Sequence, residues 1–184
     1  MTTPVVSAQK PVILPWQGVW PKIDETVFVA PTACIIGDVE IGADSSIWFN
    51  VTVRGDVNSI RIGARSNIQD GSVIHVTRQK HETVIGDDVL VGHMAVIHGC
   101  RLESGSFVGM GATVMDGAVV EGGAMVAAGA LVSPGKVVKA GQLWAGTPAR
   151  YIRDLTPEER ESLPKGTAHY ANMGRQYREM LAGG

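Results

Sequence analysis

Three histidines, His75, His93 and His98, are separated by 18 and 5 residues. Neutral imidazole is a common ligand of Zn²⁺, and three such ligands leave one coordination position open for water. An ion in such a site lowers the pKa of its bound water toward about 7 and so provides hydroxide at neutral pH. The three residues are therefore candidate ligands of a catalytic metal site if the fold brings them together.

A six-residue repeat surrounds these histidines and predicts where they lie. An aliphatic residue recurs at every sixth position, and a small or β-branched residue usually follows it four positions later. The aliphatic series is Val29, Ile35, Ile41, Ile47, Val53, Ile62, Ile68, Ile74, Ile85, Val91, Ile97, Leu102, Val108, Val114, Val120, Val126, Val132 and Val138. A helix repeats at 3.6 residues and a single strand at 2, so neither explains this pattern. It predicts a triangular parallel solenoid whose turns stack around a continuous apolar column.

The six-residue spacing is interrupted at three places, and each interruption lies beside a polar residue. The interruptions contain Arg54-Gly55-Asp56, a loop that begins at His75, and His98. Irregularity of this kind is typical of functional sites. With three repeats in each turn, His75 and His98 follow the same corner one turn apart, where stacked strands lie about 4.8 Å from each other. His93 follows the preceding corner, along an adjacent edge, and a neighbouring subunit of a three-fold trimer could supply it.

The organisation of the chain is predicted in three parts. Residues 1–25 form an extended segment, residues 26–150 form the β-helix of about six coils, and residues 151–184 form a helical segment packed alongside. Thr156 and Glu159 have the spacing of a capping box, with Pro157 suited to the first helical position. Pro164 and Gly166 then predict an interruption, followed by a second helix over about residues 167–181.

Composition excludes several classes of function. The net charge is −2 and no basic stripe is present, which argues against nucleic acid as a partner. No apolar run approaches the roughly 18 residues of a membrane span. Two cysteines, Cys34 and Cys100, make no disulfide framework. The first ten residues lack the plan of an export signal, so a cytoplasmic protein is expected.

The chain resembles the γ-class carbonic anhydrases, which are hexapeptide-repeat proteins with a left-handed parallel β-helix. The matching stretches are Arg54-Gly55-Asp56, Asn67-Ile68-Gln69-Asp70-Gly71, Val73-Ile74-His75, Val91-Gly92-His93 and Ile97-His98-Gly99-Cys100. The resemblance implies a homotrimer with a divalent metal at each subunit interface, Zn²⁺ or alternatively Fe²⁺ or Co²⁺. By similarity, His75 and His98 come from one subunit and His93 from the next. The implied reaction is the reversible hydration of CO₂ to bicarbonate by a zinc-bound hydroxide.

The resemblance also assigns roles to further residues. Gln69 matches a residue that hydrogen-bonds the bound water or the substrate, and Arg54 and Asp70 match a pair that bridges subunits beside the metal. Asp56 belongs to the same polar cluster, and Tyr170 aligns with a tyrosine that some members place near the metal.

The chain departs from the best-known active members of that family in two ways. Val57 stands in place of a glutamate, and the loop 76–84 is shorter and less acidic. Glu82 or His81 would have to replace the missing proton shuttle, so weak activity is expected. Three alternatives stay open: a metal-dependent acyl-CoA thioesterase, a catalytically silent structural trimer, and an acyltransferase that uses one basic histidine.

Overall fold

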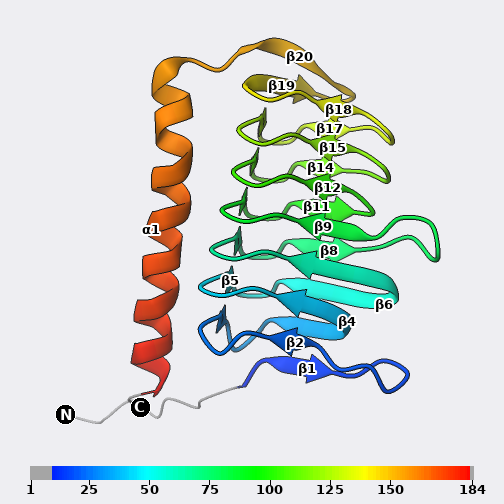
Figure 1. The fold of residues 1–184 in the computed structure, drawn as a ribbon, viewed down its shortest axis with the longest axis vertical. Helices are drawn as coiled ribbons and strands as arrows, with labels where there is room; N and C mark the ends of the chain where they lie inside the picture. The colour runs from blue at the N-terminus through cyan, green and yellow to red at the C-terminus, as the bar shows by residue number, and fades with distance from the viewer. Residues whose placement is uncertain (1–9, 183–184) are drawn as a thin grey trace.

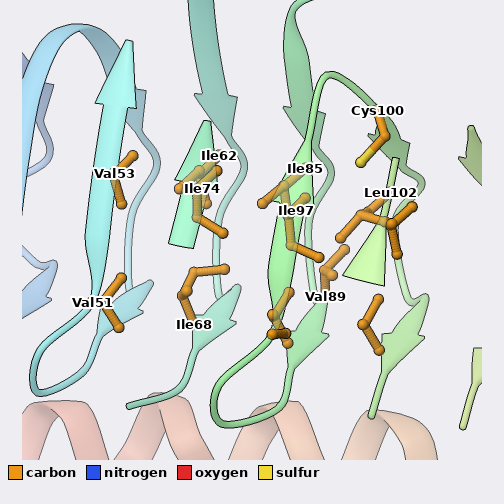
Figure 2. Packing of buried hydrophobic residues seen from close by; sticks show 14 of the residues in the cluster. Val51, Val53, Ile62, Ile68, Ile74, Ile85, Val89, Ile97, Cys100 and Leu102 are labelled. Atoms are coloured by element: carbon orange, nitrogen blue, oxygen red, sulfur yellow. The ribbon is translucent and has the colours of Figure 1, made fainter. Parts of the chain in front are cut away.

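The aliphatic residues of the repeat form the interior of a three-sided parallel β-solenoid (Figure 1). The structure is a computed structural model that describes residues 10–182. Every member of the aliphatic series from Ile35 to Val138 is buried, and Val29 is partly buried against the same core. Figure 2 shows Val53, Ile74 and Ile97 among the side chains that fill this column. The repeat therefore marks the inward-facing positions of successive strands.

Each turn of the solenoid contributes a strand to three faces. The first face contains β1 (Val12–Leu14), β8 (Val73–His75), β11 (Val96–His98), β14 (Thr113–Val114) and β17 (Leu131–Val132). The second face contains β2 (Lys22–Ile23), β9 (Thr83–Ile85), β12 (Arg101–Leu102), β15 (Val119–Val120) and β18 (Val137–Val138). The third face contains β3 (Phe28–Val29), β5 (Ser46–Ile47), β7 (Asn67–Ile68), β10 (Leu90–Val91), β13 (Phe107–Val108), β16 (Met125–Val126), β19 (Gln142–Gly146) and β20 (Ala149–Asp154).

Two long strands join the first and second faces around a corner. They are β4 (Cys34–Ile41) and β6 (Thr52–Ile62). The start of β6 pairs with β8, whereas its end pairs with β9. The first two faces therefore form one continuous 12-stranded sheet, and the third face is a separate sheet of eight strands. The pairing is parallel throughout, except that β20 returns antiparallel to β19.

The small residues of the repeat are buried where the chain bends. Ser66 illustrates their role, because its hydroxyl donates to the Gly86 carbonyl oxygen at 2.7 Å and accepts from the Val89 amide at 3.0 Å. Without this hydroxyl, the two backbone groups would lose the hydrogen bonds that Ser66 provides. The small residue that follows each aliphatic residue by four positions therefore marks a corner of the coil.

The solenoid has about seven turns, slightly more than the six predicted. β1 and β2 both pair in parallel with β4, so residues 12–23 extend the coil at its start. β18 and β19 extend it beyond Lys136, where the small-residue rule ends. The end turns need fewer buried positions, so they form without the full sequence pattern. Residues 1–9 of the expected extended segment lie outside the described residues.

A single helix, α1 (Pro157–Ala182), lies along the third face, so the prediction of two helices was wrong (Figure 1). The capping box forms as expected, with the Thr156 amide 2.9 Å from Glu159 Oε2 and the Glu159 amide 3.2 Å from Thr156 Oγ1. Pro164 lies within the helix: the capping box holds the first turn before it, and the buried residues Thr167, Ala171 and Gly174 all follow it. Within residues 10–182 no helix is long and apolar enough to cross a membrane.

Candidate metal centre

The pairing of β8 with β11 places His75 directly opposite His98. Ile74 and Ile97 precede them and are fully buried, so the alternation of a strand turns both imidazoles outward at the corner. His75 Nδ1 lies 3.2 Å from His98 Nε2. The repeat predicted this stacking, and the register reproduces it.

The separation of these two nitrogens fits a shared metal ion. Two imidazole nitrogens on a tetrahedral Zn²⁺, each at about 2.1 Å, lie about 3.4 Å apart. The observed 3.2 Å is close to that value. The two rings already face each other with the atoms that an ion would bridge, so little rearrangement is needed to bind one.

The other ring nitrogen of each histidine is engaged by a carboxylate. His75 Nε2 lies 3.0 Å from Asp56 Oδ1, and His98 Nδ1 lies 2.6 Å from Asp116 Oδ1. Asp56 also pairs with the Arg54 guanidinium. Metal-binding histidines usually donate their second N–H to such an acceptor, which fixes the tautomer and the ring orientation. The carboxylate acceptors beside the pair are thus of the kind that accompanies metal-binding histidines.

Both carboxylates are held in the ionised form. Burial raises the pKa of Asp56, but hydrogen bonds from His75 and Arg54 outweigh burial and bring this pKa below its usual range. Burial likewise raises the pKa of Asp116, and hydrogen bonds from Thr77 and His98 again reverse the direction. Each carboxylate therefore acts as a charged acceptor toward its histidine.

His93 lies in the turn that follows β10, at the opposite edge of the first face from His75 and His98. Its Nδ1 is 2.9 Å from Asp70 Oδ2, and its side chain is 43% exposed. Among residues 10–182 no group of three or more histidine, cysteine, aspartate or glutamate side chains is placed to hold a metal. One chain therefore supplies the pair of His75 and His98, and His93 faces outward from another corner.

The other predicted site residues are divided between the two edges. Arg54 and Asp56 lie beside His75, because Val53 pairs with Ile74 in the preceding position. Gln69 directly follows β7 and is buried at the corner that also carries Asp70. Within the chain Arg54 pairs with Asp56 and not with Asp70. The bridging role of Arg54 and Asp70 between subunits stays a prediction.

Tyr170 packs among aromatic side chains between α1 and the third face. Its ring centroid lies 5.9 Å from that of Trp48 and 5.5 Å from that of His169. Glu82, considered as a proton shuttle, accepts a hydrogen bond from Ser59 Oγ at 2.9 Å. His81 lies across the turn from Gly99 and Gly117, next to Asp116.

Asp116 and Thr77 are the contacts that sequence reasoning missed. Asp116 lies in the turn after β14, one turn of the coil beyond His98, and also accepts from Thr77 Oγ1 at 2.7 Å. An aspartate followed by a glycine is a common turn sequence, so residue type alone did not distinguish it. Its position in the repeat could have indicated the contact, because Asp116 lies one coil beyond His98 at the same corner.

Comparison with known proteins identifies the family of the chain. No protein-family model matches the chain. It is 54% identical over 151 residues to a probable carbonic anhydrase of Methanocaldococcus jannaschii, covering 82% of this chain and 94% of the relative. The chain belongs to the γ-class carbonic anhydrase family. Gamma carbonic anhydrase 1, mitochondrial, of Arabidopsis thaliana is 47% identical over 162 residues, which cover 85% of this chain.

A solved structure shares the fold of this chain but is named for a different activity than the sequence relatives. This γ-class chain spans about three fifths of the length of the plant relatives that it matches. A solved structure of a putative acetyltransferase from Bacillus cereus superposes with a TM-score of 0.91 at 38% identity, over 93% of this chain and 99% of that one. The two names describe different reactions, so the shared fold alone does not decide the chemistry.

Proposed function

We propose that this protein is a metal-dependent γ-class carbonic anhydrase that hydrates CO₂ reversibly at sites shared between the subunits of a homotrimer. The observation that carries the proposal is the facing pair of His75 Nδ1 and His98 Nε2, 3.2 Å apart, with a carboxylate on the opposite nitrogen of each ring. An acyltransferase that needs one basic histidine has no use for two histidines held in this way.

The donor set favours a divalent cation of intermediate softness. Imidazole nitrogens suit Zn²⁺, and also Fe²⁺ and Co²⁺. Zn²⁺ is the first choice, because three nitrogen ligands and one position open to water are typical of catalytic zinc sites. When bound by neutral imidazoles, such a cation acidifies a coordinated water, so that hydroxide is available near pH 7.

The third ligand is proposed to be His93 of a neighbouring subunit. Asp70 beside Nδ1 leaves Nε2 of this exposed ring directed to the surroundings of the chain. The outer side of the first face, which lies between the two histidine edges, carries exposed apolar residues: Val12, Leu14 and Val73. Exposed apolar residues on one face of the coil favour its use as an interface. Packing of this face against a second copy would bury it and bring His93 toward a pair on the other chain.

The remaining residues have roles that follow from their positions. Asp56 holds the outer nitrogen of His75, and the Arg54 guanidinium fixes Asp56 in turn. Asp70 has the same position toward His93. Gln69, buried next to Asp70, has a carboxamide that can donate to an oxygen of bicarbonate and accept from a water proton. Together these side chains orient the ligands and the substrate.

Stopped-flow measurement of CO₂ hydration tests the proposal. The protein is loaded with Zn²⁺ or, anaerobically, with Fe²⁺, and compared with His98→Ala treated in the same way. We expect a metal-dependent rate above the uncatalysed one and its loss in the variant, although Val57 and the short loop predict a low turnover. A protein that retains one ion per chain and gives only the uncatalysed rate would contradict the enzymatic claim.

The likeness to the putative acetyltransferase favours one second candidate, acyl chemistry on coenzyme A thioesters. Thiol release from a panel of acyl-CoA substrates distinguishes the two possibilities. Release that requires an acceptor amine or alcohol indicates acyl transfer, and release into water that requires metal indicates a thioesterase. If no thiol is released while CO₂ is hydrated, the second candidate is wrong. A metal-bound trimer that is silent in both assays would support a structural role.

A further inference from the structure

We propose that Asp116 is a positioning residue that sets the tautomer and the ring orientation of His98, and that Thr77 holds it in place. This inference rests on the proposed metal site. It adds to that site a carboxylate from the next turn of the solenoid and a contact with the loop between β8 and β9. Asp116 is not expected to touch the substrate or the metal, because it acts on the far side of the imidazole ring.

Both oxygens of Asp116 are engaged, so the carboxylate has a defined orientation. Oδ1 lies 2.6 Å from His98 Nδ1, and Oδ2 accepts from Thr77 Oγ1 at 2.7 Å. The contact with His98 is the shorter of the two histidine–aspartate contacts at the centre, since His75 and Asp56 are 3.0 Å apart. A carboxylate fixed by a second donor cannot rotate away from the ring without losing a hydrogen bond.

Thr77 is itself anchored by backbone contacts of the loop. Its amide donates to the His81 carbonyl oxygen at 2.9 Å, and its carbonyl oxygen accepts from Asn58 Nδ2 at 3.2 Å. The loop that interrupts the six-residue rhythm after His75 thus returns to hold the carboxylate beside His98. This gives the irregular segment a structural reason to lie at the metal centre.

Gly99 leaves room for the carboxylate. A Cβ atom at this position would lie 2.4 Å from Asp116 Oδ1, and Gly99 has φ of +56°, which disfavours other residues. The residue after His98 therefore has to be small if Asp116 is to reach Nδ1. Space at Gly99, the donor on Thr77 and the acceptor on Asp116 all serve the same contact.

The charge around Asp116 differs from that around Asp56. Arg54 pairs with Asp56 and offsets its negative charge, whereas Asp116 accepts from the neutral hydroxyl of Thr77 and has His81, not an arginine, as its other titratable neighbour. An acceptor on Nδ1 keeps the proton there and leaves the lone pair on Nε2, the atom that faces His75. A charged acceptor also increases the donor strength of that lone pair. Asp116 should therefore contribute more to metal affinity than Asp56.

Metal affinity and the visible spectrum of bound Co²⁺ test this inference without reference to catalysis. Asp116→Ala, Asp116→Asn and Thr77→Val are compared with wild type by competition against a chelator. The control is Asp88→Asn, which removes an exposed carboxylate that pairs with Arg65 in another turn. Unfolding temperature and oligomeric state are recorded for every variant, and Thr77→Val preserves the test if Asp116→Ala does not fold.

We expect Asp116→Ala to weaken Co²⁺ binding by about 10- to 100-fold and to change the spectrum. Asp116→Asn should retain part of the affinity, because an amide oxygen still accepts from Nδ1–H but has no charge. Thr77→Val should cost less than Asp116→Ala, and the control should match wild type. Wild-type affinity in both Asp116→Ala and Thr77→Val would overturn the inference and leave the metal site intact. A wild-type protein that binds no metal would overturn the proposed function as well.

Discussion

At the scale of single residues, all three candidate ligands share one kind of contact. Each has one ring nitrogen close to a carboxylate: Asp56 for His75, Asp70 for His93 and Asp116 for His98. The repetition is informative because the three histidines lie at two different corners, and His75 and His98 come from successive turns. A chance surface histidine has no reason to share this arrangement with two others.

A prediction at this scale uses the two other histidines of the chain as controls. His75→Ala, His93→Ala and His98→Ala should each reduce bound metal from about one ion per chain to a small fraction. A site with three nitrogen ligands loses most of its metal affinity when one of the three is removed. His81→Ala and His169→Ala should retain metal, since neither belongs to the proposed ligand set. Metal analysis of freshly purified, dialysed protein measures the effect. Full metal content in His93→Ala would contradict the ligand assignment.

The residues also show which parts of the site the sequence could predict. The facing of His75 and His98 followed from counting corners, because the interior positions of the coil are strictly periodic. The contact of Asp56 with His75, and of Arg54 with Asp56, agrees with the position of both residues at an interruption of the repeat. Asp116 was missed because Asp-Gly is a common turn sequence, although its place 18 residues after His98 puts it at the same corner in the next coil.

At the scale of elements, α1 shows how tertiary contacts outweigh a local signal. Pro164 predicted a break, yet the helix is continuous from Pro157 to Ala182. The side of the helix that meets the third face carries small buried residues, Ala171 and Gly174, so the backbone approaches the sheet closely. The sequence did not predict strands β1 and β2 either. They pair with β4 at the end of the coil, where pairing does not require the six-residue repeat.

The start of this helix should respond to acid. Hydrogen bonds from Arg153 and from the Thr156 amide lower the pKa of Glu159 from 4.5 to about 2. A lowered pKa in the folded state means that the stabilisation is complete above pH about 4.5 and is lost as the pH falls toward 2. The unfolding temperature of wild type should therefore fall more steeply over this window than that of Glu159→Gln.

The control for that experiment is Glu161→Gln, which removes a carboxylate of the same helix that pairs with Lys165. This variant should follow the pH dependence of wild type in the same window. Parallel curves for wild type and Glu159→Gln would show that the contact between Arg153 and the helix start contributes nothing in solution.

At the scale of the whole molecule, the solenoid holds the candidate ligands at two separate edges. The pair of His75 and His98 lies at one edge of the first face and His93 lies at the other, with exposed apolar residues between them. A rigid coil cannot bend to bring the two edges together. Closed rotational symmetry solves this, because each copy then offers one edge to the preceding copy and the other edge to the next.

The most direct test of this shared centre is complementation between inactive variants. His75→Ala and His93→Ala subunits are unfolded together, refolded as a mixture and analysed for bound metal. With random assembly and head-to-tail interfaces, about one quarter of the sites should recover a complete ligand set. A mixture of His75→Ala and His98→Ala should recover none, because these two ligands come from the same chain. Equal recovery in both mixtures, or none in either, would contradict a metal centre shared between subunits.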